Sequence, residues 1–204
     1  SARMLRAGLK VLYIANEEPA HDITLRLLSR LSLIDIEDLQ KYPDARRQAF
    51  DRAGKCYYNW HLMHQGTITP RDVQRQMARI KPDILVLDQI KNVEVREDNR
   101  ALQLDKLARV VRETGIDYDA VTISVTQAGE SAEGKLVLGM TDVEWSNTGI
   151  PGAADLMIGI GVTEEWRGRD KRMLSICKNK VKNEHGSFPV YIDAQRTKIS
   201  ERPS

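Results

Sequence analysis

The residues Ile84-Leu85-Val86-Leu87-Asp88 give the clearest indication of the fold of this chain. Its four aliphatic residues follow Lys81-Pro82-Asp83, where a helical pattern ends, and they lead directly to one carboxylate. A short continuous apolar run after such a breaker is typical of a strand buried on both faces, as in a parallel sheet. The acid then lies at the strand's carboxyl end, where open α/β sheets bind ligands. Asp88 is therefore a candidate for holding Mg²⁺ on a nucleotide phosphate, and the alternative is that it only begins a loop.

Strands and helices are predicted to alternate on both sides of this stretch. Segments whose apolar residues have helical spacing lie between short apolar or β-branched runs. This alternation predicts an α/β fold with a largely parallel sheet. The last two strands are expected to pair antiparallel at the edge, and residues 128–152 are expected to form long loops. The predicted strands are 11–15, 57–63, 84–88, 121–126, 156–160, 173–177 and 189–192; the predicted helices are 19–31, two short helices within 35–54, 69–80, and 98–114 with Gly115 as its stop.

Composition sets the broad class of the protein. The chain has 204 residues, of which 41% are hydrophobic and 29% charged, and these values suit one globular α/β domain. The net charge is only +2, so any nucleic-acid binding has to come from local clusters. Two distant cysteines indicate free thiols in a reducing compartment. No apolar run reaches the ~18 residues of a membrane span, and we expect a soluble cytoplasmic protein without a membrane partner.

Four predicted strand ends carry residues in an order that resembles the successive motifs of RecA-fold ATPases. The resemblance is to the DnaB-type replicative helicases and their bacteriophage relatives, and it covers residues 8–195. It implies a RecA-like three-layer fold with a largely parallel central sheet and an antiparallel edge. The segments that carry it are Ile14-Ala15-Asn16-Glu17-Glu18-Pro19-Ala20, Ile84 to Asp88, Ser124-Val125-Thr126-Gln127, and Ser146-Asn147-Thr148-Gly149 followed by Asp155-Leu156-Met157-Ile158.

The resemblance implies a DNA-dependent ATPase and assigns roles to three residues. Glu17 matches the catalytic glutamate that polarises the attacking water, Asp88 matches the Walker B aspartate that holds Mg²⁺, and Gln127 matches the sensor of the γ-phosphate. Each has a structural alternative. Glu17 can serve, as we expect Glu18 to serve, as an acid in the first turn of a helix. Gln127 can be an ordinary residue where a strand passes into a loop.

Two further matches concern DNA and the neighbouring subunit. Loops 128–139 and 141–152 correspond to the DNA-contacting loops of the family, although they contain a single cation and phosphate contact is usually built from several. Lys178 and Lys180 correspond to a Lys-x-Arg pair that reaches the nucleotide of the next subunit. The Lys-x-Lys form resembles RecA recombinases instead, and lysine lacks the bidentate fork of arginine. The alternative for the loop candidates is that they are ordinary loop residues. The alternative for Lys178 and Lys180 is that they belong to a solvated basic strand edge. The DNA-binding candidates are Lys135, Trp145, Asn147, Thr148 and Gly149.

No phosphate-binding loop precedes residue 11. Residues 129–135 fit G-x4-G-K, but Leu136 replaces the hydroxyl residue that reaches Mg²⁺, and no helix pattern follows. We therefore interpret this match as coincidental and expect the true loop upstream. Residues 1–7 then form the tail of the helix after that loop, and the chain is a fragment of a single RecA-like domain, 1–204, that lacks the phosphate-loop strand. In this fold that strand lies inside the sheet, so its absence would leave unpaired interior backbone, which is costly. The alternative to a fragment is therefore that another segment fills the slot, and we expect the isolated chain to be inactive.

The predicted function is the motor domain of a replicative DNA helicase in a bacterial or phage-infected cell. It hydrolyses ATP with Mg²⁺ between the subunits of a homo-oligomer, either a hexameric ring or a filament, and moves on single-stranded DNA. Two alternatives stay open: a RecA-like recombinase or loader, and a catalytically inactive scaffold subunit. A Ser/His/Asp hydrolase is disfavoured, because the four histidines are scattered and no nucleophile-elbow pattern is present.

Overall fold

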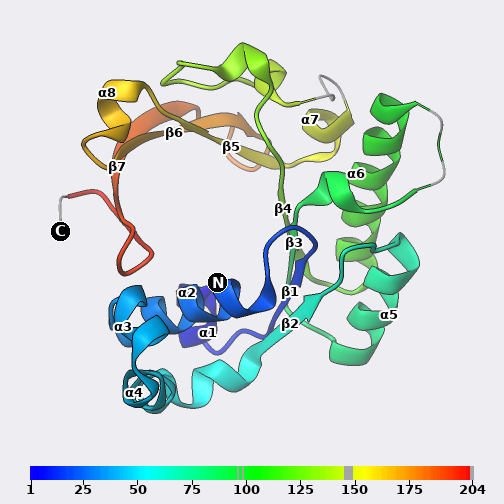
Figure 1. Ribbon diagram of the computed structural model, residues 1–204. Helices are drawn as coiled ribbons and strands as arrows, with labels where there is room; N and C mark the ends of the chain where they lie inside the picture. Colours follow the sequence, from blue (N-terminus) through cyan, green and yellow to red (C-terminus); the bar gives the residue numbers. More distant parts are fainter. Residues whose placement is uncertain (96, 98, 145–148, 203–204) are drawn as a thin grey trace. The chain divides into compact units, whose positions relative to one another are not determined.

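A computed structural model describes residues 1–95, 97, 99–144 and 149–202 (Figure 1). The chain divides into two compact units, and each is described by itself. Unit 1 comprises residues 1–95, 113–125 and 194–198, and unit 2 comprises residues 96–112, 126–193 and 199–204. No helix among the described residues is long and apolar enough to cross a membrane.

Unit 1 is built on a four-stranded parallel sheet in the order β2-β1-β3-β4. The strands are β1 (Val11–Ala15), β2 (Trp60–His64), β3 (Ile84–Asp88) and β4 (Val121–Val125), and every neighbouring pair is parallel. β3 lies between β1 and β4, and its four aliphatic residues are at most 6% exposed. The stretch Ile84–Asp88 is therefore a central strand buried on both faces, as predicted.

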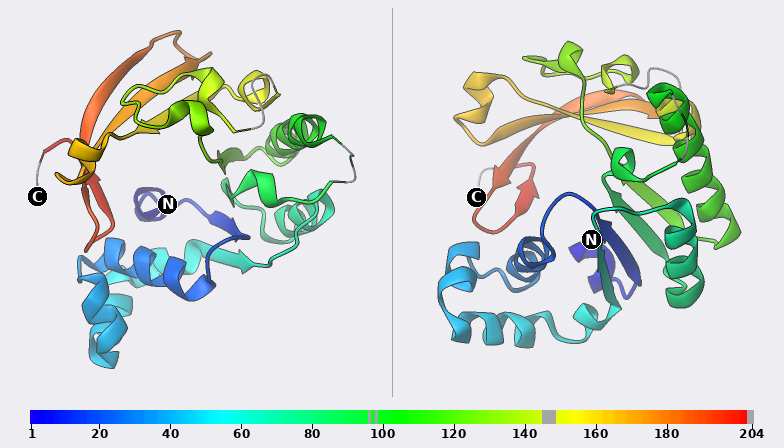
Figure 2. Two further views of the ribbon diagram at one scale, coloured as in Figure 1. Left: turned by 45° about the horizontal axis from the view of Figure 1, so that its top comes forward. Right: turned by 45° about the vertical axis from the view of Figure 1, so that its right-hand side comes forward.

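Helices cover both faces of this sheet. Alternate strand residues point to opposite faces, and Val11, Ile84 and Val86 join an apolar cluster with residues of α1, α2, α3 and α4. The helices on this side are α1 (Ala2–Arg6), α2 (Ala20–Ser32), α3 (Ile36–Lys41) and α4 (Pro43–Ala53), with α3 and α4 packed against α2 (Figure 2). α5 (Pro70–Ile80) lies on the other side of the sheet (Figure 1).

The start of α5 shows how closely local sequence specifies this part of the fold. Thr69 is the N-cap, and its Oγ1 accepts a hydrogen bond from the Asp72 backbone N–H at 3.4 Å. Asp72 returns the contact by accepting from the Thr69 N–H at 3.0 Å, and Pro70 occupies the first helical position. This reciprocal capping satisfies backbone donors that a helix end leaves without partners. The predicted helix boundary is confirmed.

Unit 2 is built on a second sheet, in the order β5-β6-β7-β8. The β5–β6 and β6–β7 pairs are both antiparallel. The strands are β5 (Leu156–Gly161), β6 (Lys171–Asn179), β7 (Gly186–Asp193) and β8 (Lys198–Ser200). Two short helices belong to this unit, α7 (Gly149–Ala153) and α8 (Glu164–Arg167), together with the first part of α6 (Arg100–Asp117).

Three predictions about individual elements were wrong, and one strand was not predicted. The strand expected at 57–63 begins only at Trp60, because residues 54–59 form the 3₁₀ helix η1 (Gly54–Asn59). Gly115 does not stop the preceding helix, since α6 continues to Asp117. A Cβ at Gly115 would lie 2.9 Å from both Ala120 O and Thr122 Cγ2, so its role is close packing. β5 belongs to the antiparallel sheet and not to the parallel one. β8 was missed.

The first helix and the edge of the parallel sheet bear on the phosphate-loop question. Residues 2–6 are helical and Gly8 follows with φ +84°, which agrees with the expected glycine at the end of this helix. Among the described strands, β4 has a partner on one side only. Its end residues Val121 and Val125 are 61% and 40% exposed. β4 is therefore one edge of this sheet, with β2 as the other, and a further strand could pair beside it.

Candidate functional site

Glu17 and Asp88 come together because their strands are neighbours in register. Ala15, the last residue of β1, pairs with Asp88, the last residue of β3. The ladder continues by one bond, from the Asn16 N–H to the Asp88 carbonyl at 3.0 Å. Both acids therefore stand at the carboxyl edge of a parallel sheet, the edge at which such sheets bind ligands.

Asn16 and Gln89 join the two strand ends just beyond the ladder. The Asn16 side chain accepts from the Gln89 backbone N–H at 2.6 Å and donates to the Gln89 carbonyl at 2.9 Å. Asn16 is 8% exposed and Gln89 is 6% exposed. The Asp88–Gln89 peptide bond in this segment is cis. One buried amide thus satisfies both backbone groups of the residue after Asp88.

The two glutamates after β1 have different partners. Gln89 Nε2 donates a hydrogen bond to Glu17 Oε2, so Glu17 is held from the β3 side. Glu18 pairs instead with Arg26 of α2, with 2.5 Å between Glu18 Oε2 and Arg26 Nη2. Glu18 is therefore tied to α2, whereas Glu17 points to the strand end that carries Asp88. The expectation that Glu18 is an acid in the first turn of the helix was wrong, because α2 begins at Ala20 with Pro19 as its N-cap and Asp22 is the acid in that turn. The role expected for Glu17 stays a prediction.

Tyr13 holds the carboxylate of Asp88. Its phenol donates a hydrogen bond to Asp88 Oδ2 from the middle of the neighbouring strand β1. Burial, followed by the hydrogen bond and charge of Asp88, raises the pKa of Tyr13 well above its usual value. The phenol therefore stays protonated, as a donor must. One oxygen of Asp88 is engaged by Tyr13, and the other has no such partner on β1.

Unit 2 gathers Lys178, Lys180 and Arg112 around the end of α7. Lys178 Nζ donates to the Pro151 carbonyl, and Lys180 Nζ donates to the Gly152 carbonyl at 3.4 Å. Burial, and then the neighbouring Lys180, lower the pKa of Lys178. The two lysines can therefore also have a structural role at the end of α7, because the carbonyls at a helix C-terminus attract cations.

Arg112 of α6 adds a guanidinium to the same cluster. It lies 3.2 Å from Asp155 Oδ1, the oxygen that Lys180 approaches to 3.7 Å, and it also donates to the Ala153 carbonyl at 3.3 Å. Two cations thus share one carboxylate, with Lys178 beside them. Arg112 was not predicted, since nothing in the spacing of a helical residue connects it with a strand so much later in the chain.

Lys135, the candidate cation for DNA contact, is paired with Asp142. Their Nζ and Oδ1 atoms are 2.9 Å apart, and the Asp142 side chain is only 7% exposed. Asp142 also accepts from the Gly139 N–H at 2.8 Å and from Ser131 Oγ at 3.1 Å. The Gly139 hydrogen bond, followed by the bond to Lys135, lowers the pKa of Asp142. Asp142 therefore organises the loop and holds its cation.

The other loop candidates have separate positions. Gly149 begins α7 and lies against α6, where a Cβ would fall 1.5 Å from Asp105 Oδ1. The added Cβ would also lie 2.7 Å from the backbone Cα of Asp105, so the close packing against α6 favours glycine here. Trp145, Asn147 and Thr148 lie outside the described residues. Gln127 is exposed and follows β4 closely; its carbonyl accepts a bond from the Glu144 N–H at 3.3 Å.

The G-x4-G-K match at 129–135 does not have the structure of a phosphate cradle. Glu130–Ala132 forms one 3₁₀ turn, and residues 136–139 are irregular instead of starting a helix. A phosphate cradle needs backbone amides that converge at a helix N-terminus. The interpretation of this match as coincidental therefore agrees with the local structure.

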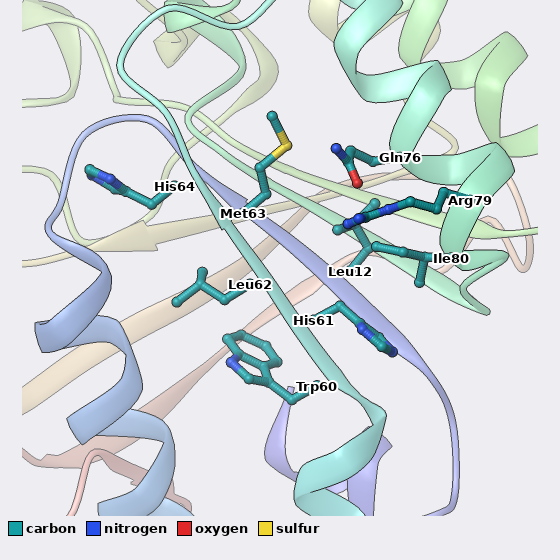
Figure 3. A pocket seen from close by; sticks show the side chains of 9 residues that line it. All are labelled: Leu12, Trp60, His61, Leu62, Met63, His64, Gln76, Arg79 and Ile80. Atoms are coloured by element: carbon teal, nitrogen blue, oxygen red, sulfur yellow. The ribbon is translucent and has the colours of Figure 1, made fainter.

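A pocket of about 460 Å³ opens elsewhere in unit 1, between β2 and α5 (Figure 3). None of the predicted site residues lines it. Trp60 Nε1 and Gln76 Oε1 are buried without a hydrogen-bond partner among the described residues. Burial, and then the charges of Lys10 and Arg79, lower the pKa of His61. The pocket lining is Leu12, Trp60, His61, Leu62, Met63, His64, Gln76, Arg79 and Ile80.

No family model and no curated protein matches the chain. Several solved structures, in contrast, are similar to the chain in fold. One of them, an ATPase domain, superposes with a TM-score of 0.83 at 14% identity, covering 99% of this chain and 78% of that one. A DnaB-like replicative helicase gives 0.82 at 14%, covering 98% and 52%, so the chain spans about half the length of that helicase. The RadB recombinase gives 0.59 at 13%, covering 98% and 81%. The predicted RecA-like fold, similar to DnaB-like helicase ATPase domains, is confirmed.

Proposed function

We propose that residues 1–204 belong to a single RecA-like ATPase domain, the motor of a cytoplasmic replicative DNA helicase. In this proposal ATP is hydrolysed at the interfaces of a homo-oligomer, a hexameric ring or a filament, and the protein moves on single-stranded DNA. The observation that carries the proposal is the meeting of Glu17 and Asp88 at the ends of adjacent in-register parallel strands. It is supported by a fold similar to an ATPase domain and to a DnaB-like replicative helicase.

The residues at the end of β3 fit Mg²⁺ on a nucleotide phosphate. Asp88 offers a hard carboxylate oxygen, and Tyr13 fixes the orientation of the group through the other oxygen. When bound, Mg²⁺ would neutralise charge on the phosphates. Because Mg²⁺ keeps several waters and takes few protein ligands, one aspartate suits it. Groups of three or more His, Cys, Asp or Glu side chains with metal-binding geometry do not occur among the described residues.

Glu17 is assigned the role of general base. Its carboxylate takes a proton from water as the water oxygen bonds to the γ-phosphorus and the bond to ADP breaks. Holding the carboxylate at a strand end fixes its direction, and orientation is a large part of catalysis in phosphoryl transfer. The proton is later returned to solvent, so Glu17 is regenerated.

Lys178, Lys180 and Gln127 are assigned to the γ-phosphate. The two lysines would stabilise charge in the site of the next subunit, and Gln127 would report the phosphate to the DNA-binding loops. The proposal keeps Lys135, Trp145, Asn147, Thr148 and Gly149 as loop residues near DNA. Release of Lys135 from Asp142 would then accompany phosphate contact, since one ammonium cannot serve both partners fully.

Two alternatives have support of their own. A RecA-like recombinase or loader is favoured by the Lys-x-Lys pair and by the similarity to the RadB recombinase, at a lower TM-score. A catalytically inactive scaffold subunit is favoured by the irregular structure after Lys135, because the phosphate cradle would have to come from another segment.

ATP turnover by the full-length protein tests the proposal. We expect hydrolysis that single-stranded DNA stimulates and that Glu17→Gln reduces by about 100-fold or more, with nucleotide binding retained. Glu18→Gln is the matched control, because it changes the adjacent acid, which pairs with Arg26. Displacement of an annealed strand would favour the helicase, and strand exchange would favour the recombinase. No turnover with or without DNA would leave the scaffold alternative and contradict the proposed ATPase.

A further inference from the structure

We propose that Gln89 is a positioning residue for Glu17 and sets the direction of its carboxylate during ATP hydrolysis. The inference rests on the proposed function, in which Glu17 is the general base. Nothing in the sequence motifs singles out Gln89, which simply follows Asp88. It is the structure that connects it with Glu17, through a direct side-chain hydrogen bond between the ends of β1 and β3.

The contact holds one oxygen of Glu17. Gln89 Nε2 donates to Glu17 Oε2, and Oε1 is left for the proton of the attacking water. A primary amide does not titrate in the working range, so this donor keeps its charge state while the carboxylate gains and loses a proton. Gln89 therefore orients the base without taking part in the proton transfer itself.

Asn16 makes Gln89 a rigid support. Its side chain binds both the N–H and the C=O of Gln89, at 2.6 and 2.9 Å, and both residues are nearly buried. Asn16 directly precedes Glu17, so the connection is reciprocal. The residue before the base fixes the backbone of Gln89, and the side chain of Gln89 fixes the base. A carboxylate on a free loop would have no such restraint.

The remaining atom of the Gln89 side chain argues against a purely structural role. Gln89 Oε1 is buried and has no hydrogen-bond partner among the described residues. A buried acceptor without a partner costs stability. A side chain kept only for packing would be better as an isosteric apolar group, whereas a donor aimed at Glu17 requires the amide.

Gln89→Met separates these roles, since methionine has a similar shape and no donor. In the full-length protein we expect kcat for ATP hydrolysis to fall about 10- to 100-fold, because small misplacements of a catalytic group have effects of this size. KM for ATP and the thermal unfolding temperature should stay close to the wild-type values. Gln76→Met is the matched control: it alters another glutamine with a buried Oε1 in unit 1, on α5, and should leave kcat unchanged.

Gln89→Asn gives a second test, because it keeps an amide but withdraws it by one methylene. We expect Gln89→Asn to lower kcat as well, with KM unchanged. This variant provides the test if Gln89→Met does not fold. Wild-type kcat in a folded Gln89→Met or Gln89→Asn protein would overturn the positioning role and leave the proposed function intact. Absence of turnover by the wild-type protein would instead overturn the proposed function.

Discussion

Tyr13 on β1 donates its phenolic hydrogen to Oδ2 of Asp88 at the end of β3. The two strands are parallel and in register, with Tyr13 beside Val86 and Ala15 beside Asp88, so the phenol reaches diagonally along one face of the sheet. Through this contact a side chain in the middle of one strand fixes a carboxylate at the end of the next. The orientation of Asp88 is therefore built into the sheet.

Loss of this contact should weaken the response to Mg²⁺. Tyr13→Phe keeps the ring and removes the donor, so the Asp88 carboxylate can rotate. We expect the Mg²⁺ concentration for half-maximal ATP turnover to rise by about 10-fold, in line with the loss of other groups that orient a metal ligand. Tyr57→Phe is the control, because Tyr57 is half-buried in the same unit. An unchanged Mg²⁺ dependence would contradict the orienting role of Tyr13.

The same tyrosine should make the protein less stable in alkali. Burial and Asp88 raise the pKa of Tyr13 in the folded protein, whereas an unfolded tyrosine titrates near pH 10. Above about pH 10 the unfolded chain loses this proton first, so stability falls as pH rises. Urea unfolding between about pH 9 and pH 11 should show a smaller loss for Tyr13→Phe than for the wild type. Tyr58→Phe, at an 81% exposed position, should follow the wild type; equal slopes for all three would refute this account.

Asp142 should stabilise unit 2. It is nearly buried and binds Lys135, Ser131 and the Gly139 N–H, so Asp142→Ala removes several hydrogen bonds to one charge. We expect a loss of about 2 kcal/mol in the free energy of unfolding, measured with urea. Glu133→Ala, at an exposed position of the same loop, should have little effect. A loss of similar size in both variants would argue against a special role for Asp142.

The contribution of Asp142 should also disappear in acid. Its pKa is lowered in the folded protein, so its stabilisation is present above the usual aspartate pKa of about 4. It is lost as pH falls through the lowered value, because the unfolded chain takes up the proton first. A wild-type and an Asp142→Ala protein with the same dependence on pH in this range would contradict the prediction.

Gly161 should not tolerate any side chain. A Cβ there would lie 1.9 Å from the carbonyl oxygen of Leu136, which is backbone and cannot move aside alone. Gly161→Ala should destabilise the protein by about 2 kcal/mol, as expected for overpacking. Gly186→Ala is the matched control in the same sheet, where nothing lies within 4 Å of the added Cβ. Equal melting temperatures for both variants would show that the backbone at Leu136 adapts freely.

The sequence was sufficient to predict the parallel sheet and the position of Asp88 at the carboxyl end of one of its strands. A continuous apolar run is distinctive, and parallel strands in register bring their carboxyl ends together whatever the loops do. Ile84–Asp88 and Val11–Ala15 were predicted to the residue for this reason. Gly115 was wrongly predicted to end its helix. A glycine that ends a helix and one that allows close packing within a helix look the same in the sequence.

The supporting contacts of the site could not be predicted. Tyr13, Asn16 and Gln89 act across strands, through side-chain reach and direction that spacing does not encode. The one sequence feature that pointed to the Tyr13–Asp88 contact was a tyrosine two residues before the end of β1. Once the register is known, this tyrosine shares a face of the sheet with Asp88. The pairing of Lys135 with Asp142 likewise depends on a loop without regular structure.

Binding of a fluorescent ATP analogue to the full-length protein tests whether the ends of β1 and β3 form a nucleotide site. We expect Mg²⁺-dependent binding by the wild type and binding weakened by about 10-fold or more in Asp88→Ala. We also expect near wild-type binding by Glu17→Gln, whose carboxylate acts on water and not on the nucleotide. Absence of binding by the wild type, or equal binding by Asp88→Ala, would contradict a nucleotide site at the ends of β1 and β3.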